Sequence, residues 1–190
     1  MAMEDLERTA EALRRRGFDA VCCATRAAAA AYVMALAEDA ATVGQGGSMT
    51  LKELGLPEAL AAAGKAPARR ADVDLFLLSA NALTRDGRLV NVDGNGNRVA
   101  ASINGPRRVC YVVGRNKLVA GGVDDALARV KRCACPPNCR RLGKKTPCAA
   151  TGVCADCDSP DRICKVTVVF DRRPTGVACT VVLVDEDLGY

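Results

Sequence analysis

The chain alternates short apolar runs with stretches of helical periodicity, and this alternation constrains the fold more than any other feature. Residues 73–79 (VDLFLLS) are almost continuously apolar, as a buried parallel strand requires. Asp86-Gly87 sits between residues 82–84 and 89–92 as a hairpin turn. Further strands are expected at 19–24, 41–43, 109–113, 166–170 and 177–184, and helices at 4–16, 25–39, 48–54, 57–63, 98–103 and 123–132. The pattern predicts an α/β fold with three layers, a mostly parallel sheet flanked by helices, a β-hairpin and a cysteine-rich loop of metal-binding type.

The length and the apolar content are enough for one domain. The chain has 190 residues, of which 49% are hydrophobic, so it can bury a sizeable core. We expect a single domain over residues 1–190, with an N-terminal helical part at 1–40 and a cysteine-rich insertion at 133–165. The longest apolar stretch, residues 27–37, is too short to cross a bilayer, and no signal-type segment opens the chain. These features predict a cytoplasmic protein without membrane contact.

Four cysteines have a metal-ligand spacing, Cys148-x5-Cys154-x2-Cys157-x6-Cys164, in a segment with loop-forming residues. Four thiolates within one short segment can surround a tetrahedral zinc ion or a 4Fe-4S cluster, and the sequence does not decide between the two. The alternatives are disulfides or inert, partly buried thiols. Because the chain contains no histidine, histidine-based metal sites and catalytic triads are excluded.

The remaining seven cysteines carry weaker signals. Four of them lie in apolar or strand-like runs, and we interpret them as core residues: Cys22, Cys23, Cys110 and Cys179. The role of the other three stays open: Cys133, Cys135 and Cys139. Eleven cysteines without an export signal suit a reducing compartment, where thiols are more often ligands or redox groups than disulfides.

Three polar turns follow expected strands and have the composition of an anion site. The turn at residues 44–48 is rich in glycine, residues 91–98 combine amides with Asp93 and Arg98, and residues 115–117 place Lys117 after a strand. If the three strand ends converge, they form a pocket for a small anion. The alternatives are a simple helix cap at the first turn and a polar turn at the second. Aromatic residues make up only 3% of the chain and the net charge of +5 is interleaved, which argues against a nucleic-acid partner.

Several long motifs resemble the LUD-domain (lactate utilisation) family: VGQGGSMTLKELGL, LFLLSANALTRDGRLVNVDGNGNRVAA, GPRRVCYVVGRNKLV and TPCAATGVCADCDSPDRIC. The resemblance covers residues 43–190 and implies a NagB/RpiA/CoA-transferase-like fold and a role in lactate or related small-anion redox metabolism with an iron–sulfur partner protein. By this resemblance the ligand-binding residues are Gly44, Gly46, Gly47, Ser48, Asn81, Asn97, Arg98 and Asn116. Glu53, Asp93 and Lys117 are the expected catalytic residues, with a carboxylate as general base and a cation balancing the charge of the substrate.

Two further functions remain open at this point. The chain is either a non-catalytic scaffold or ligand sensor with a structural zinc bound only by cysteines, or an isomerase or transferase acting on a phosphorylated small molecule. The sequence leaves the substrate, the metal, catalysis itself and the oligomeric state undecided, with a homo-oligomer among the alternatives.

Overall fold

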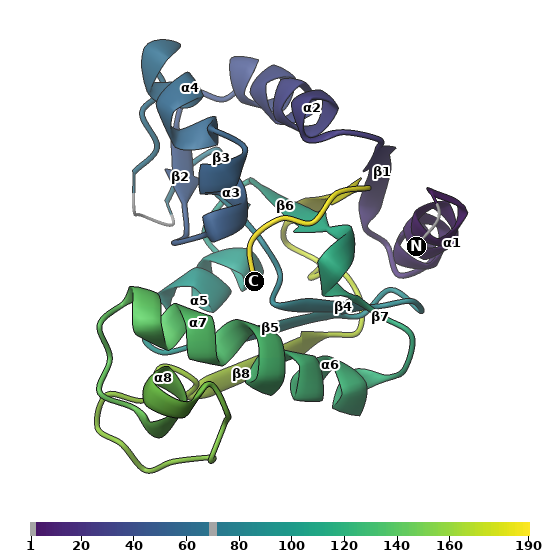
Figure 1. The fold of residues 1–190 in the computed structure, drawn as a ribbon. Coiled ribbons are helices and arrows are strands. Elements are labelled where there is room, and N and C mark those ends of the chain that lie inside the picture. The colour runs from purple at the N-terminus through teal and green to yellow at the C-terminus, as the bar shows by residue number, and fades with distance from the viewer. Residues whose placement is uncertain (1–2, 69–71) are drawn as a thin grey trace.

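The computed structural model describes residues 3–68 and 72–190, and its central element is a five-stranded parallel sheet (Figure 1). The order is β1-β9-β6-β3-β2, and every neighbouring pair is parallel. The strands are β1 (Asp19–Cys23), β2 (Val43–Gln45), β3 (Leu75–Leu78), β6 (Arg108–Gly114) and β9 (Ala178–Val184). This sheet confirms the predicted α/β class. β3 is buried at all four positions, as its apolar run indicated.

Helices cover the sheet on both faces, and the alternation of side chains along β6 shows why. Tyr111 belongs to a core cluster that contains Leu13 of α1, whereas Val112 belongs to a second cluster that contains Val33 of α2. The helices that precede β6 are α1 (Met3–Arg15), α2 (Arg26–Glu38), α3 (Met49–Glu53), α4 (Leu56–Ala62) and α5 (Asn97–Ile103). Thr25 caps α2 by accepting the N–H of Ala28 at 3.2 Å, as its position predicted.

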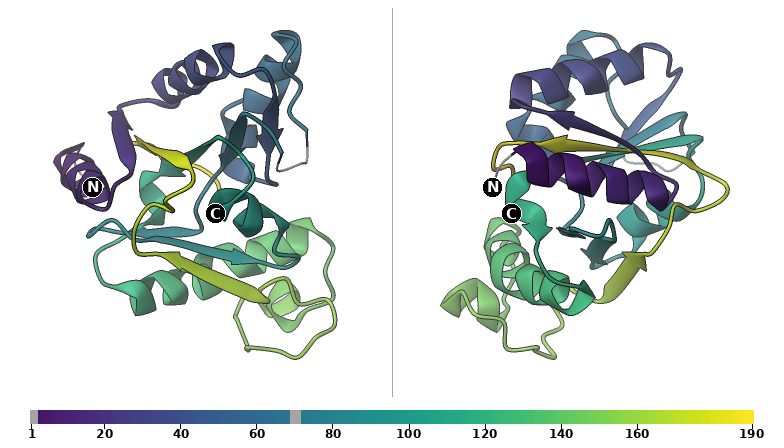
Figure 2. Two further views of the ribbon diagram at one scale, coloured as in Figure 1. Left: turned by 180° about the vertical axis from the view of Figure 1, so that it is seen from behind. Right: turned by 90° about the vertical axis from the view of Figure 1, so that its right-hand side faces the viewer.

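A second sheet of four strands lies on the other side of the parallel sheet from α2 and α4 (Figure 2). Its order is β7-β4-β5-β8, built from β4 (Ala82–Thr84), β5 (Leu89–Asp93), β7 (Leu118–Val119) and β8 (Val166–Phe170). β4 and β5 are antiparallel, which confirms the hairpin at Asp86-Gly87. The second sheet itself was not predicted, because an apolar run does not state which partner it pairs with. As a result β8 and β9, consecutive along the chain, belong to different sheets.

The cysteine-rich region begins as a helix rather than a loop. α6 (Val123–Arg129) continues through a π-helical turn, η2 (Val130–Ala134), into α7 (Cys135–Arg141), and α8 (Pro147–Thr151) follows. Pro136 and Pro137 lie in the first turn of α7, directly after the π-helical turn. Residues 133–141 are therefore helical, and Cys135 and Cys139 share one face of α7. None of the described helices is long and apolar enough to cross a membrane.

Candidate anion-binding site

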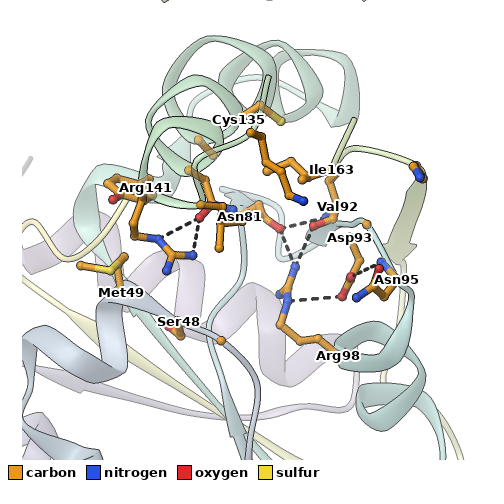
Figure 3. A pocket seen from close by; sticks show the side chains of 18 of the residues that line it. Ser48, Met49, Asn81, Val92, Asp93, Asn95, Arg98, Cys135, Arg141 and Ile163 are labelled. Carbon is orange, nitrogen blue, oxygen red and sulfur yellow. Dashed lines mark hydrogen bonds and ion pairs between the residues drawn. The ribbon is translucent and has the colours of Figure 1, made fainter. Parts of the chain in front are cut away.

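A pocket of about 480 Å³ lies where the carboxyl ends of β2, β3 and β5 face α7 and the cysteine-rich segment (Figure 3). The site residues from the sequence that line it are Gly47, Ser48, Asn81, Asp93, Asn97, Arg98 and Lys117. The structure thus brings together parts of all three polar turns. Figure 3 shows Ser48 and Arg98 on one side of the pocket, with Cys135 and Ile163 across from them.

Arg98 forms part of the pocket wall and is held by four short hydrogen bonds. Its Nη1 donates to the main-chain carbonyl of Ser79 at 2.9 Å and to Asn91 Oδ1 at 2.8 Å. Its Nη2 donates to Asn81 Oδ1 at 2.9 Å and to the main-chain carbonyl of Val92 at 2.8 Å. Burial lowers the pKa of Arg98. Because both terminal nitrogens already donate two hydrogen bonds each, Arg98 positions the strand ends and supplies positive charge but does not hydrogen-bond a ligand through these nitrogens.

Asp93 lines the pocket, and one of its carboxylate oxygens is buried without a hydrogen-bond partner among the described residues. Its Oδ1 accepts the main-chain N–H groups of Asn95 and Gly96, each at 3.1 Å. Its Oδ2 is buried without a hydrogen-bond partner in the described part of the chain and lies 3.6 Å from Arg98 Nε, too far for a hydrogen bond. The side chain is only 10% exposed. A ligand hydroxyl or amine that reached this buried oxygen would supply the hydrogen bond that it lacks.

Lys117 ends the 3-10 turn η1 (Arg115–Lys117) after β6 and places its amine inside the pocket wall. Its Nζ donates to Thr50 Oγ1 at 2.6 Å and to Ser79 Oγ at 2.8 Å, and the residue is only 4% exposed. Burial, reinforced by neighbouring cations, lowers the pKa of Lys117 to about 7. Near neutral pH the amine is consequently present in both charged and neutral forms.

Arg129 is a further buried cation, and the sequence did not single it out. It comes from α6, is 5% exposed, and donates to the main-chain carbonyls of Asn116 at 2.9 Å and Asn81 at 2.7 Å. Arg129 and Arg98 both lower the pKa of Lys117, whereas Glu53 raises it. The site therefore concentrates positive charge that Asp93 offsets only in part.

The other expected site residues lie outside the pocket lining. Glu53 is exposed and accepts the N–H of Gly189 at 2.7 Å, and Asn116 binds both Leu188 and Gly189. Both side chains thus fix the segment that follows β9. Gly44 lies within β2, and a Cβ on Gly46 would lie 2.7 Å from Arg98 Cγ, so these two glycines allow close packing behind the site. Their role toward a ligand stays a prediction.

The cysteine-rich segment forms the opposite wall. A Cβ on Gly94 would lie 3.2 Å from the carbonyl oxygen of Ile163, and the N–H of Lys165 donates to the main-chain carbonyl of Asp93 at 3.0 Å. The segment and α7 add cations that the sequence analysis missed, because their approach to the pocket depends on tertiary packing: Arg141, Lys144, Arg162 and Lys165.

All eleven cysteines carry free thiols. Cys148 is buried on α8, and Cys154, Cys157 and Cys164 are partly buried beyond it. Across residues 3–68 and 72–190, no three cysteine, aspartate or glutamate side chains already converge as metal ligands. The four cysteines of the predicted quartet therefore do not form a preformed metal site.

Two cysteines from α7 do lie close to members of that quartet. Burial raises the pKa of the Cys135 thiol to about 12, and the thiols of Cys164, Cys139, Cys154 and Cys148 act in the same direction. Cys135 also packs in the same apolar cluster as Cys164. The i, i+4 spacing of Cys135 and Cys139 places both thiols on one face of a helix. The sequence indicates this proximity only if residues 135–141 are recognised as helical.

The fold and this pocket define an α/β protein with a cationic cavity at the carboxyl ends of its strands. The LUD domain model matches residues 6–184, and the chain belongs to this lactate utilisation-related family. A crystal structure of a DUF162 family protein from Deinococcus radiodurans is similar in fold, with 13% sequence identity, a TM-score of 0.57 and coverage of 97% of this chain and 99% of that one. No curated protein matches the chain.

Proposed function

We propose that this LUD-domain protein binds a small carboxylate or phosphorylated anion in the pocket, as part of lactate or related small-anion redox metabolism. The observation that carries the proposal is the surplus of buried positive charge. Arg98 and Arg129 are largely buried cations, Lys117 adds a third buried charge in its protonated form, and the carboxylate of Asp93 lies 3.6 Å from Arg98. A buried cation without a carboxylate partner is costly, and a bound anion would offset that cost.

The residues of the pocket would divide the work of binding. Rim cations such as Arg141 and Lys165 would raise the local concentration of the anion. Lys117 would then contact the acid group of the anion, while Arg98 and Arg129 would contribute positive charge without contacting the anion. The free Oδ2 of Asp93 would accept a hydroxyl hydrogen of the ligand, or act as the general base if the chain is catalytic.

A thermal-shift screen tests anion binding, because a ligand that binds only the folded state raises the apparent melting temperature. The panel comprises lactate, related hydroxy acids, sugar phosphates, folates and coenzyme A. We expect at least one anion to stabilise the wild type and to lose most of its effect in Lys117→Met. Lys52→Met is the matched control, because Lys52 is exposed and lies outside the pocket lining. An absence of stabilisation by every compound, or equal effects in both variants, would contradict the proposal.

We also propose that the cysteine-rich segment binds zinc or a 4Fe-4S cluster through Cys148, Cys154, Cys157 and Cys164. The support is chemical: four thiols lie in one segment that carries no disulfide. Because these thiols do not converge in the structure, metal binding would have to draw the segment together, as expected where metal binding and folding are coupled. A resident cluster would suit electron exchange with an iron–sulfur partner protein, and the free thiols suit a cytoplasmic location.

Metal analysis of protein purified without oxygen tests this second proposal. We expect near-stoichiometric zinc, or iron with sulfide, in the wild type and loss of the metal in the double variant Cys154→Ser, Cys157→Ser. Cys133→Ser serves as the control, because Cys133 is exposed and lies outside the quartet. A metal-free wild type in which all four thiols alkylate readily would refute it.

A further inference from the structure

Lys117 has a hydrogen-bond pattern that fits a neutral amine. Its two acceptors, the hydroxyls of Thr50 and Ser79, each donate their own hydrogen elsewhere: Thr50 Oγ1 to the main-chain carbonyl of Leu188 at 3.2 Å, and Ser79 Oγ to that of Ala80 at 3.3 Å. Both hydroxyls must therefore accept from Lys117, at 2.6 and 2.8 Å. Two hydrogens of Nζ are thereby satisfied, and no third acceptor for Nζ is present in the described part of the chain.

An amine with two satisfied hydrogens has a lone pair left, whereas an ammonium would leave a third N–H unpaired in a buried wall. An unpaired buried donor is costly. Lys117 also forms no ion pair with a carboxylate within residues 3–68 and 72–190. The charged groups around it are the cations Arg98 and Arg129 and the carboxylate of Glu53. Two cations beside a desolvated lysine favour the neutral, nucleophilic form.

We propose that Lys117 is a catalytic nucleophile that forms an imine with the carbonyl carbon of a small 2-oxo acid. This inference rests on the proposed function, because the carboxylate of the 2-oxo acid would be the anion that the pocket binds. It goes further by naming the reacting atom and the carbonyl that the ligand must carry.

The reaction is balanced without an oxidant or a reductant. The lone pair of Nζ attacks the carbonyl carbon to form a C–N bond, and a proton from the amine moves to the carbonyl oxygen. The resulting carbinolamine then loses its hydroxyl group and the second amine proton as water, which leaves a C=N bond. Asp93 lines the same pocket, and its Oδ2 has no hydrogen-bond partner in the described residues, so this carboxylate would carry the proton between these atoms.

The surroundings of Lys117 favour a 2-oxo acid over a simple aldehyde. The buried cations would hold a carboxylate next to the carbonyl, and the pocket volume of about 480 Å³ is ample for a compound of a few carbons. Lys65 provides a contrast, because its Nζ donates to three main-chain carbonyls, those of Ala37, Glu38 and Ala40.

Borohydride trapping tests the imine. The intact protein is incubated with pyruvate, glyoxylate, 2-oxobutyrate or 2-oxoglutarate, reduced with sodium borohydride, and digested for tandem mass spectrometry. We expect one secondary-amine adduct located at Lys117, formed faster at mildly alkaline than at mildly acidic pH. Lys117→Arg should lack the adduct, and Lys65→Arg should retain it.

The outcomes separate this inference from the proposed function. An adduct at Lys117 supports both. Thermal stabilisation by 2-oxo acids, with no adduct or with adducts scattered over exposed lysines, overturns the imine but leaves anion binding intact. An absence of both stabilisation and adduct, in wild-type protein shown to be folded by circular dichroism, overturns the inference and counts against the pocket as well.

Discussion

The guanidinium of Arg98 donates to the side-chain carbonyl of Asn81 at 2.9 Å, and the same oxygen accepts the main-chain N–H of Val92 at 2.9 Å. Arg98 also donates to the main-chain carbonyl of Ser79, which directly follows β3, and to that of Val92 in β5. Arg98 thereby links the parallel sheet to the hairpin sheet.

Removal of that link should destabilise the protein. Arg98→Met would remove the donor to Asn91 Oδ1 and to the main-chain carbonyls of Ser79 and Val92. We expect a loss of about 3 kcal/mol in the free energy of unfolding, measured by urea denaturation. Arg107→Met is the control, because that side chain is 84% exposed and its ion pair with Asp74 is long at 3.6 Å, so its effect should stay below about 1 kcal/mol. Similar losses in the two variants would show that Arg98 is not a structural link.

Neighbouring glycines should differ sharply in their tolerance of alanine. A Cβ on Gly46 would lie 2.7 Å from Arg98 Cγ and 2.8 Å from Cδ, whereas a Cβ on Gly47 would meet nothing within 4 Å. We expect Gly46→Ala to cost about 1–3 kcal/mol of stability and Gly47→Ala less than about 1 kcal/mol. Thermal unfolding of both variants under one buffer condition provides the comparison. Equal stability would mean that Arg98 moves aside without penalty.

The affinity for anions without a carbonyl group should depend on pH through Lys117. Its pKa is lowered to about 7, so the ammonium form dominates below that pH and the neutral amine above it. Binding of a hydroxy acid or phosphate ester should therefore be strongest in mildly acid buffer and weaken by up to about tenfold per pH unit above the pKa. Calorimetric titrations across this range should give a flat, weaker profile for Lys117→Met. An unchanged slope in that variant would assign the pH dependence to another group.

Thiol reactivity should follow burial. Burial raises the pKa of Cys110 and that of Cys179, the latter to about 12, so few thiolates form there at neutral pH. Cys133 is exposed, and we expect iodoacetamide to modify it far sooner than either core thiol. Mass spectrometry of peptides from timed reactions would measure the order. Early labelling of Cys110 in folded protein would contradict the packing of the parallel sheet.

The fold could be predicted from sequence where the signals are local. The apolar run at residues 73–79 predicted β3, Asp86-Gly87 predicted the β4–β5 hairpin, and Thr25 predicted the start of α2. The second sheet could not be predicted, because the pairing of β5 with β8 joins residues far apart in the chain and leaves no local mark.

The site was predictable in its strand-end residues but not in its far wall. Lys117 and Asp93 stood out because they follow strands, and both line the pocket. The role of Cys135 was left open, because its place in the pocket wall depends on residues 135–141 forming a helix that packs against the strand ends. Nothing in the sequence around Arg129 indicates that this helical residue is buried. Its position near Lys117 follows from the packing of α6.

A crystal structure with the most stabilising anion from the thermal-shift panel would show directly where the anion binds. We expect the acid group of the ligand to lie in the pocket between Gly47 and the cysteine-rich segment, within hydrogen-bond distance of Lys117 Nζ. A ligand bound elsewhere on the surface, with this pocket filled only by water, would contradict it.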